Sequence, residues 1–185
     1  MPKLHNYTLK EALALARSRC AVPLTLGEKP LIVVDFDDTI WNKNGTSNSL
    51  VVEWIKWAID QHGGDAQCVA IVTARNGISK ESIEAVSRCL KHLSLPEIQV
   101  VFRPRNISNT LASIAVWKAQ VRMSYRSSGY HILASIGDNW GDCIDPEIWE
   151  DSSLPDLPFI GRGVVVFKDA SADGYMGVVV GTQTS

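Results

Sequence analysis

The chain alternates between short apolar runs and longer amphipathic stretches, and this pattern predicts an α/β fold. Five apolar runs are long enough for a strand and too short for a helix of their own. They lie at about residues 31–35, 67–73, 98–102, 131–136 and 163–168. Runs without polar alternation are typical of parallel strands that helices cover on both faces. The stretch GYMGVVV at residues 174–180 predicts one further short strand at the edge of the sheet.

The segments between these runs predict helices at about residues 8–20, 50–62, 80–94 and 110–126. Thr8 and Glu11 have the spacing of a capping box, and Ser79 stands where it would cap the third helix. Residues 42–49 are polar and predict a loop. Residues 143–162 are rich in Asp, Pro and Trp without a clear period, which predicts an ordered loop with at most one helical turn.

The length and composition of the chain are those of one globular domain. It has 185 residues, of which 45% are hydrophobic. The prediction is a single domain over residues 1–185. An N-terminal helix and connector occupy residues 1–30, a core occupies residues 31–168, and a C-terminal edge segment occupies residues 169–185.

Residues 1–30 have no apolar core of the secretory type, because charged side chains interrupt every apolar stretch there. The longest apolar runs, about five residues, are far too short to span a membrane. The four cysteines are scattered and form no CxxC pair, which favours reduced thiols over a disulfide framework. The prediction is a cytoplasmic protein without a membrane segment. The oligomeric state stays open.

The net charge of −2 is unevenly distributed along the chain. Residues 75–136 carry nine basic and three acidic side chains, whereas residues 137–185 carry two basic and nine acidic ones. The basic segment could attract an anionic substrate, or it could consist of solvated helix faces. No run of five like charges occurs, so a nucleic-acid-binding tail is not expected.

Residues 31–40, LIVVDFDDTI, form the most informative stretch of the chain. An apolar strand ends there in Asp35, Asp37, Asp38 and Thr39. Three carboxylates within four positions repel one another unless a cation or another partner compensates them. Ligands of open α/β sheets bind beyond the carboxyl ends of the strands. We therefore expect these carboxylates to carry chemistry rather than to form a turn.

Polar residues also follow the second and fourth apolar runs, and a lysine lies in the helix before the fourth. These residues are Thr73, Ala74, Arg75, Lys118, Asp138, Asn139 and Asp142. The ends of parallel strands share one edge of the sheet, so the groups can converge there. Carboxylates suit a hard divalent cation such as Mg²⁺. The alternatives are a strand-end Thr73, a solvated Lys118 and a loop-forming Asp142.

The segments DFDDT and GDNWGD, the IVT ending of the second run and Lys118 resemble the four motifs of the haloacid dehalogenase superfamily. The order of the motifs matches, and the likeness covers roughly residues 31–168. The resemblance implies a three-layer α/β/α Rossmann-like fold with a mostly parallel sheet of five strands. It also implies the strand order 5-4-1-2-3.

The resemblance further implies a Mg²⁺-dependent phosphatase that forms a phospho-aspartate. Asp35 would be the nucleophile and Asp37 the general acid and base. Thr73 would hold a phosphoryl oxygen, and Lys118 would offset negative charge. The metal would be held by Asp35, the backbone carbonyl of Asp37, Asp138 and Asp142.

Neighbours of these motifs are predicted to contact the substrate. They are Thr39, Trp41, Ala74, Arg75 and Asn139. Trp41 could stack on a base or simply pack, and both interpretations stay open. Asp38 is expected to face solvent or to assist rather than to catalyse.

Members of this family carry cap domains in two places, and neither place has room for one here. Only 33 residues separate Thr39 from Thr73, and residues 76–118 are used up by a helix, a strand and the start of a helix. The resemblance therefore implies a member without a cap domain, whose open site suits a large or partner-presented substrate. The phosphorylated substrate could be a nucleic-acid end or a small molecule.

Three alternatives remain. The first is a narrower activity, polynucleotide 3′-phosphatase or nucleotidase. The second is a non-catalytic protein that binds a phosphorylated ligand on the same fold. The third is a phospho-accepting receiver domain, whose acceptor Asp would end the third strand. That run ends here in Phe102-Arg103, which argues against a receiver.

Overall fold

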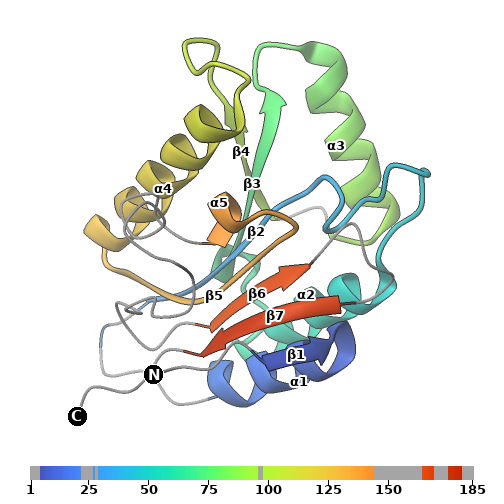
Figure 1. Ribbon diagram of the computed structural model, residues 1–185, viewed down its shortest axis with the longest axis vertical. Helices are drawn as coiled ribbons and strands as arrows, with labels where there is room; N and C mark the ends of the chain where they lie inside the picture. Colours follow the sequence, from blue (N-terminus) through green and yellow to red (C-terminus); the bar gives the residue numbers. More distant parts are fainter. Residues whose placement is uncertain are drawn as a thin grey trace.

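The computed structural model describes residues 5–21, 27, 29–95, 98–143, 164–168 and 175–180. A seven-stranded sheet with the order β1-β7-β6-β5-β2-β3-β4 forms its centre (Figure 1). The strands are β1 (His5–Thr8), β2 (Lys29–Val34), β3 (Val69–Asn76), β4 (Gln99–Arg103), β5 (Tyr130–Gly137), β6 (Val164–Lys168) and β7 (Tyr175–Val180). The strands from β6 to β4 pair in parallel, whereas β7 is antiparallel to both β6 and β1.

Six helices are described, and a side chain caps the start of four of them. The six are α1 (Leu9–Cys20), α2 (Ser49–Gln61), the 3₁₀ helix η1 (Ala66–Cys68), α3 (Lys80–His92), α4 (Leu111–Ser127) and the short α5 (Trp140–Cys143). Ser79 accepts a hydrogen bond from the Ser82 N–H at the start of α3, as the sequence predicts. Asn48 and Thr110 cap α2 and α4 in the same way.

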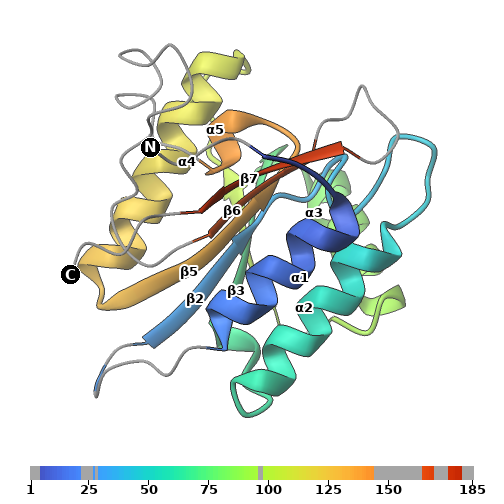
Figure 2. The ribbon, with the colours of Figure 1, turned by 60° about the horizontal axis from the view of Figure 1, so that its bottom comes forward.

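Helices cover both faces of the sheet. Successive side chains of β2 point to opposite faces, so they pack into two separate cores. Ile32 and Val34 belong to the larger core, which also includes buried residues of α1, α2 and α3. Leu31 and Val33 belong to a second core with Trp117 of α4. Figure 2 shows α1 and α2 on one side of the strands and α4 on the other.

The predicted α/β fold with a parallel sheet and helices is confirmed, but the predicted number of strands is wrong. Among the described residues the sheet has seven strands, whereas the sequence predicted five and one further edge strand. Segment 175–180 lies between β6 and β1, not at the edge. The edge strand on that side is β1, whose sequence HNYT has no apolar run, and its partner β7 lies at residues 175–180. Apart from Cys143, the predicted loop at 143–162 is outside the described residues.

The described thiols are poorly suited to chemistry. Cys20, Cys68 and Cys89 are free. Burial raises the pKa of Cys20 to about 12 and that of Cys68 to about 11. Since the thiolate is the reactive form, these two side chains are weak nucleophiles.

As for the membrane, none of the described helices combines the length and the apolar character that a crossing requires.

Candidate functional site

The candidate site lies where β2, β3 and β5 end side by side. Asp35 follows β2 directly, and its backbone N–H donates to the carbonyl of Ile136 in β5 at 2.8 Å. The strand pairing therefore continues up to the carboxylate, and this pairing fixes the position of Asp35. The side chain is buried, with an exposed fraction of 6%.

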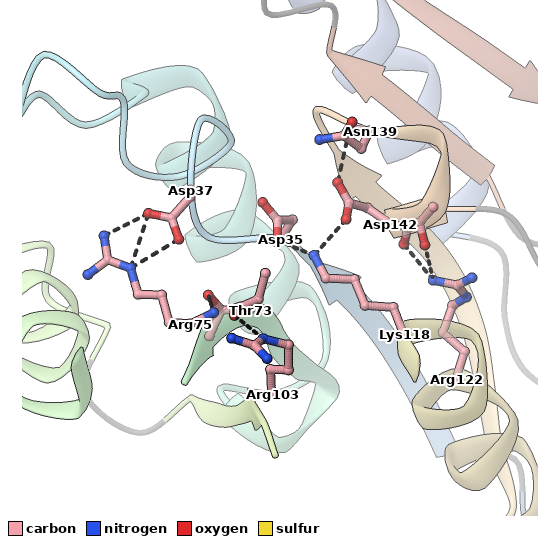
Figure 3. A network of polar contacts seen from close by, with 11 residues as sticks. Asp35, Asp37, Thr73, Arg75, Arg103, Lys118, Arg122, Asn139 and Asp142 are labelled. Carbon is pink, nitrogen blue, oxygen red and sulfur yellow. Dashed lines mark hydrogen bonds and ion pairs between the residues drawn. The ribbon is translucent and has the colours of Figure 1, made fainter. Parts of the chain in front are cut away.

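A buried ammonium group joins two of the predicted carboxylates (Figure 3). Lys118 projects from α4, is 3% exposed, and donates to the Asp35 carboxylate and to Oδ1 of Asp142, the latter at 2.6 Å. A solvated helix lysine would not be buried between two acids. The structure thus brings together three residues that the sequence marks as candidates, from three different elements.

The loop after β5 is shaped to present Asp142 to Lys118. The Asn139 N–H donates to Oδ2 of Asp142 at 2.9 Å, and the Asp142 N–H donates to the Asn139 carbonyl at 3.0 Å. A Cβ at Gly137 would lie 2.3 Å from the Cβ of Asp142, and one at Gly141 would lie 2.6 Å from the Cβ of Ala115. Because neither residue has a Cβ, Gly137 can lie close to the side chain of Asp142, and Gly141 can lie close to α4.

Arg122 binds the backbone of the same loop. The sequence did not identify this residue as a candidate. Its side chain is 1% exposed, and Nη1 donates to the carbonyls of Gly141 at 3.2 Å and Asp142 at 2.7 Å. It stands one helical turn after Lys118, so the two cations bind the same loop side by side. The sequence signal that could have identified Arg122 is its spacing of four residues from Lys118, which places both cations on one face of a helix.

We expect Arg122→Met to lower the free energy of unfolding by about 2–4 kcal/mol, because two buried carbonyls lose their charged donor. Urea denaturation measures this change. Arg126→Met is the matched control, because Arg126 is exposed on the same helix, and its effect should stay within about 0.5 kcal/mol. Equal effects of the two substitutions would show that Arg122 does not hold the loop.

Three carboxylates could together hold a cation. Oxygen atoms of Asp35, Asp138 and Asp142 lie within 4.8 Å of one another. With Lys118 included, the cluster has a formal excess of two negative charges. Such an all-oxygen donor set with this charge suits a hard divalent ion such as Mg²⁺.

Burial and mutual repulsion raise the pKa of two acids in this cluster, Asp35 and Asp138. Burial, followed by the charge of Asp142, raises the pKa of Asp35, and Lys118 opposes this rise. Burial, followed by the charges of Asp142 and Asp38, raises the pKa of Asp138 to about 6. Burial alone would lower the pKa of Lys118, but the attraction of Asp35 and Asp142 outweighs it and raises that pKa. A cation would therefore relieve real repulsion.

Asp37 is not part of this cluster, because Arg75 binds its carboxylate. Arg75 donates from Nε to both oxygens, at 3.1 and 3.0 Å, and from Nη2 to Oδ1 at 2.7 Å. The guanidinium also lies 5.0 Å from the ring centre of Phe36. Figure 3 shows Asp37 turned toward Arg75, on the other side of Asp35 from Lys118. This pairing was not predicted, since Arg75 was expected to contact the substrate.

Asp38 shapes the turn after β2. Its φ of 56° lies in the left-handed region, which suits Asp better than most residues. Its carboxylate accepts from the Lys43 N–H at 3.2 Å and pairs with the Lys43 ammonium at 2.8 Å. The side chain is 16% exposed, so it assists this turn rather than facing open solvent.

A cavity of about 230 Å³ opens above the carboxylates. Five acids line it: Asp35, Asp37, Asp38, Asp138 and Asp142. The predicted contact residues Ala74 and Asn139 also line it, as do Lys43, Lys118 and the first turns of α4.

Three other predicted site residues do not line this cavity. Thr73 is buried, and its Oγ1 accepts from the Arg75 N–H at 3.2 Å. Thr39 is buried too, and its hydroxyl has no hydrogen-bond partner among the described residues. Trp41 is partly buried against the core, and its backbone pairs with Asp37 and Ser47.

In the comparisons with known proteins, no protein-family model and no curated protein matches the sequence. The geometry of the site therefore carries the functional conclusion.

Proposed function

We propose that the chain is a Mg²⁺-dependent phosphomonoester hydrolase of the haloacid dehalogenase superfamily, acting through a phospho-aspartate on Asp35. One observation carries the proposal. Asp35, Lys118 and Asp142 come from three separate elements and meet at one cavity, with Asp138 beside them. Buried clusters of acids around a cation cost stability, and a sequence retains them more readily where they perform chemistry.

The arrangement of the elements supports this family and a site without a cap domain. The run β6-β5-β2-β3-β4 within the sheet corresponds to the expected order 5-4-1-2-3, and helices cover both faces. The interval between Thr39 and Thr73 holds a loop, α2, η1 and part of β3. The interval from residue 76 to Lys118 holds α3, β4 and the start of α4. Neither interval has residues left for a cap domain.

In the proposed reaction, an oxygen of Asp35 attacks the phosphorus of the substrate while the bond to the leaving oxygen breaks. Asp37, once it has left its ion pair with Arg75 and taken up a proton from solvent, gives that proton to the leaving oxygen, which departs as an alcohol. Asp37 then takes a proton from water, and this water attacks the phosphorus, which releases phosphate and restores Asp35. A carboxylate is a weak nucleophile, so the step depends on positioning and on neutralised charge.

The surrounding residues supply that positioning. Lys118 donates to the Asp35 carboxylate and would offset the charge that phosphoryl oxygens bring. The Thr73 oxygen accepts from the Arg75 N–H and would thereby position the end of β3 beside the cavity. Arg75 would orient Asp37 at the cavity mouth. Asp35, Asp138 and Asp142 would hold Mg²⁺, which when bound neutralises charge on the phosphoryl group.

Hydrolysis of p-nitrophenyl phosphate tests the proposal. We expect turnover with Mg²⁺ and its loss when EDTA is added in excess. If the rate with Mg²⁺ equals the rate without protein, the proposed activity is wrong. A protein that then still binds inorganic phosphate would support the alternative, a non-catalytic phospho-ligand-binding protein.

We expect Mg²⁺ to stabilise the fold at pH 7.5 and much less at pH 5. The pKa of Asp138 is raised from 3.8 to about 6, so the folded state keeps a proton that the unfolded chain has already released. The resulting contribution to stability is present below about pH 4 and is lost as the pH rises through 6. At pH 7.5 the carboxylate is free for the metal.

Thermal melts at the two pH values measure this effect. At about ten times its Kd, Mg²⁺ should raise Tm by about 3–6 °C at pH 7.5. Asp138→Asn should remove most of the difference between the Tm shift that Mg²⁺ causes at pH 7.5 and the one that it causes at pH 5. A metal effect that is as large at pH 5 as at pH 7.5 would contradict the role of Asp138.

A further inference from the structure

The side chains around the cavity are predominantly anionic. Five carboxylates and two ammonium groups, those of Lys43 and Lys118, line it. Both ammonium groups already have partners. Lys118 bonds to Asp35 and Asp142, and Lys43 pairs with Asp38 at 2.8 Å. With the Arg75 guanidinium that pairs with Asp37, the excess is two negative charges, which one divalent cation would neutralise and one phosphate dianion would restore.

The basic segment 75–136 does not make the cavity positively charged, because several of its cations bind groups of the protein itself. Arg75 pairs with Asp37, and Lys118 and Arg122 are buried in the contacts described above. Arg103 donates from Nε to the Ala74 carbonyl at 2.8 Å and from Nη1 to the Ile107 carbonyl. These four cations organise the strand ends and loops around the site, so they are not free to bind a second anionic group.

One wall of the cavity is apolar and exposed. Leu111 is the first residue of α4, lines the cavity and has an exposed fraction of 74%. Ile114 and Ala115 continue this wall, and Ala74 lines the cavity from the end of β3. A large aliphatic side chain exposed beside five acids gives the leaving group of a substrate an apolar surface on which to pack.

We propose that this site hydrolyses monophosphates of uncharged alcohols with an apolar or aromatic group, and that polyanions such as nucleic-acid ends are poor substrates. This inference rests on the function proposed above. A second phosphate of the same substrate would lie within a Debye length, about 8–10 Å, of the acidic lining, where salt screens repulsion incompletely. The apolar wall would instead gain from burying hydrocarbon.

Three esters test the preference, with kcat/KM measured at saturating Mg²⁺. They are 3-phenylpropyl phosphate, glycerol 3-phosphate and an oligonucleotide with a 3′-phosphate. The first two release primary alcohols, so the comparison reflects binding more than leaving-group chemistry. We expect 3-phenylpropyl phosphate to exceed glycerol 3-phosphate by about tenfold, as packing of a few carbons allows. The oligonucleotide should be the slowest of the three.

A pair of variants assigns the preference to the wall. Leu111→Ser should lower kcat/KM for 3-phenylpropyl phosphate by about fivefold, with a smaller fall for glycerol 3-phosphate. Met123→Ser is the matched control. Met123 is 60% exposed on the same helix, does not line the cavity, and has a helix propensity close to that of Leu. It should leave all three rates unchanged.

The outcomes separate this inference from the proposed function. Hydrolysis of the oligonucleotide as fast as, or faster than, 3-phenylpropyl phosphate would overturn the inference and leave the phosphatase intact. The same holds if Leu111→Ser and Met123→Ser behave alike. If none of the three esters is hydrolysed in a Mg²⁺-dependent way, both the function and the inference are wrong.

Discussion

Asp35→Asn is expected to lower Mg²⁺-dependent turnover by about 10³-fold or more, as removal of a nucleophile does in other enzymes. The amide has nearly the same shape as the carboxylate, but it cannot form the phospho-aspartate. It also removes one of the three oxygen donors that lie within 4.8 Å of one another. The variant should therefore lose turnover without a change of fold.

The stability of Asp35→Asn distinguishes a catalytic role from a structural one. Burial and the charge of Asp142 both disfavour the ionised form of Asp35. A neutral side chain at this position should therefore leave the metal-free protein as stable as the parent, or slightly more stable. Thermal melts measured without Mg²⁺ test this expectation alongside the rates.

Asp38→Asn is the matched control in the same segment, because Asp38 faces Lys43 rather than Lys118. Its turnover should change by less than about tenfold, as for a residue outside the reacting groups. Turnover of Asp35→Asn within tenfold of the parent would place the nucleophile elsewhere and contradict the proposed mechanism.

Lys118→Met should have the largest effect on stability, together with a loss of activity. Asp35 and Asp142 would then be buried acids without their shared cation. Removal of one partner from a buried ion pair typically costs about 3–5 kcal/mol. Urea denaturation without metal measures this loss, and Lys80→Met serves as the control. Lys80 is exposed and lies 3.7 Å from Glu84, so its removal should cost less than about 0.5 kcal/mol.

The pH dependence of Lys118→Met follows from the same pair. Lys118 opposes the raised pKa of Asp35, so its removal raises that pKa further. A group with a raised pKa in the fold contributes stability that is lost as the pH rises through that pKa. The variant should therefore lose more stability than the parent as the pH rises above 3.8, the ordinary pKa of Asp, which unfolding at pH 5 and at pH 8 measures, and added Mg²⁺ should restore part of it. A variant as stable as the parent at both pH values would contradict the burial of this cation.

The fold was predictable wherever a local pattern determined it. The apolar runs gave β2 to β5, and Ser79 gave the start of α3. The strand β1 was not predictable, because its four residues carry no pattern and its partner β7 lies about 170 residues away in the sequence. Long-range pairing at a sheet edge depends on tertiary structure rather than on local propensity.

The site was predictable to the extent that strand ends converge. The chain order of the polar segments and the parallel sheet together indicated Asp35, Lys118 and Asp142 as neighbours. The Arg75–Asp37 pair and the role of Arg122 depend on side-chain directions that spacing does not determine. A long cation can reach several partners, so its identity alone does not say which one it binds.

The buried ammonium group of Lys118 acts as a counter-ion that cannot diffuse away. A free ion leaves its site when its concentration falls, whereas a tethered one keeps the same effective concentration under all conditions. In this protein, the tethered charge lies between Asp35 and Asp142 without any metal. Part of the stability of the fold thereby persists without magnesium, and bound metal would add to it, whereas the proposed catalysis depends on magnesium entirely.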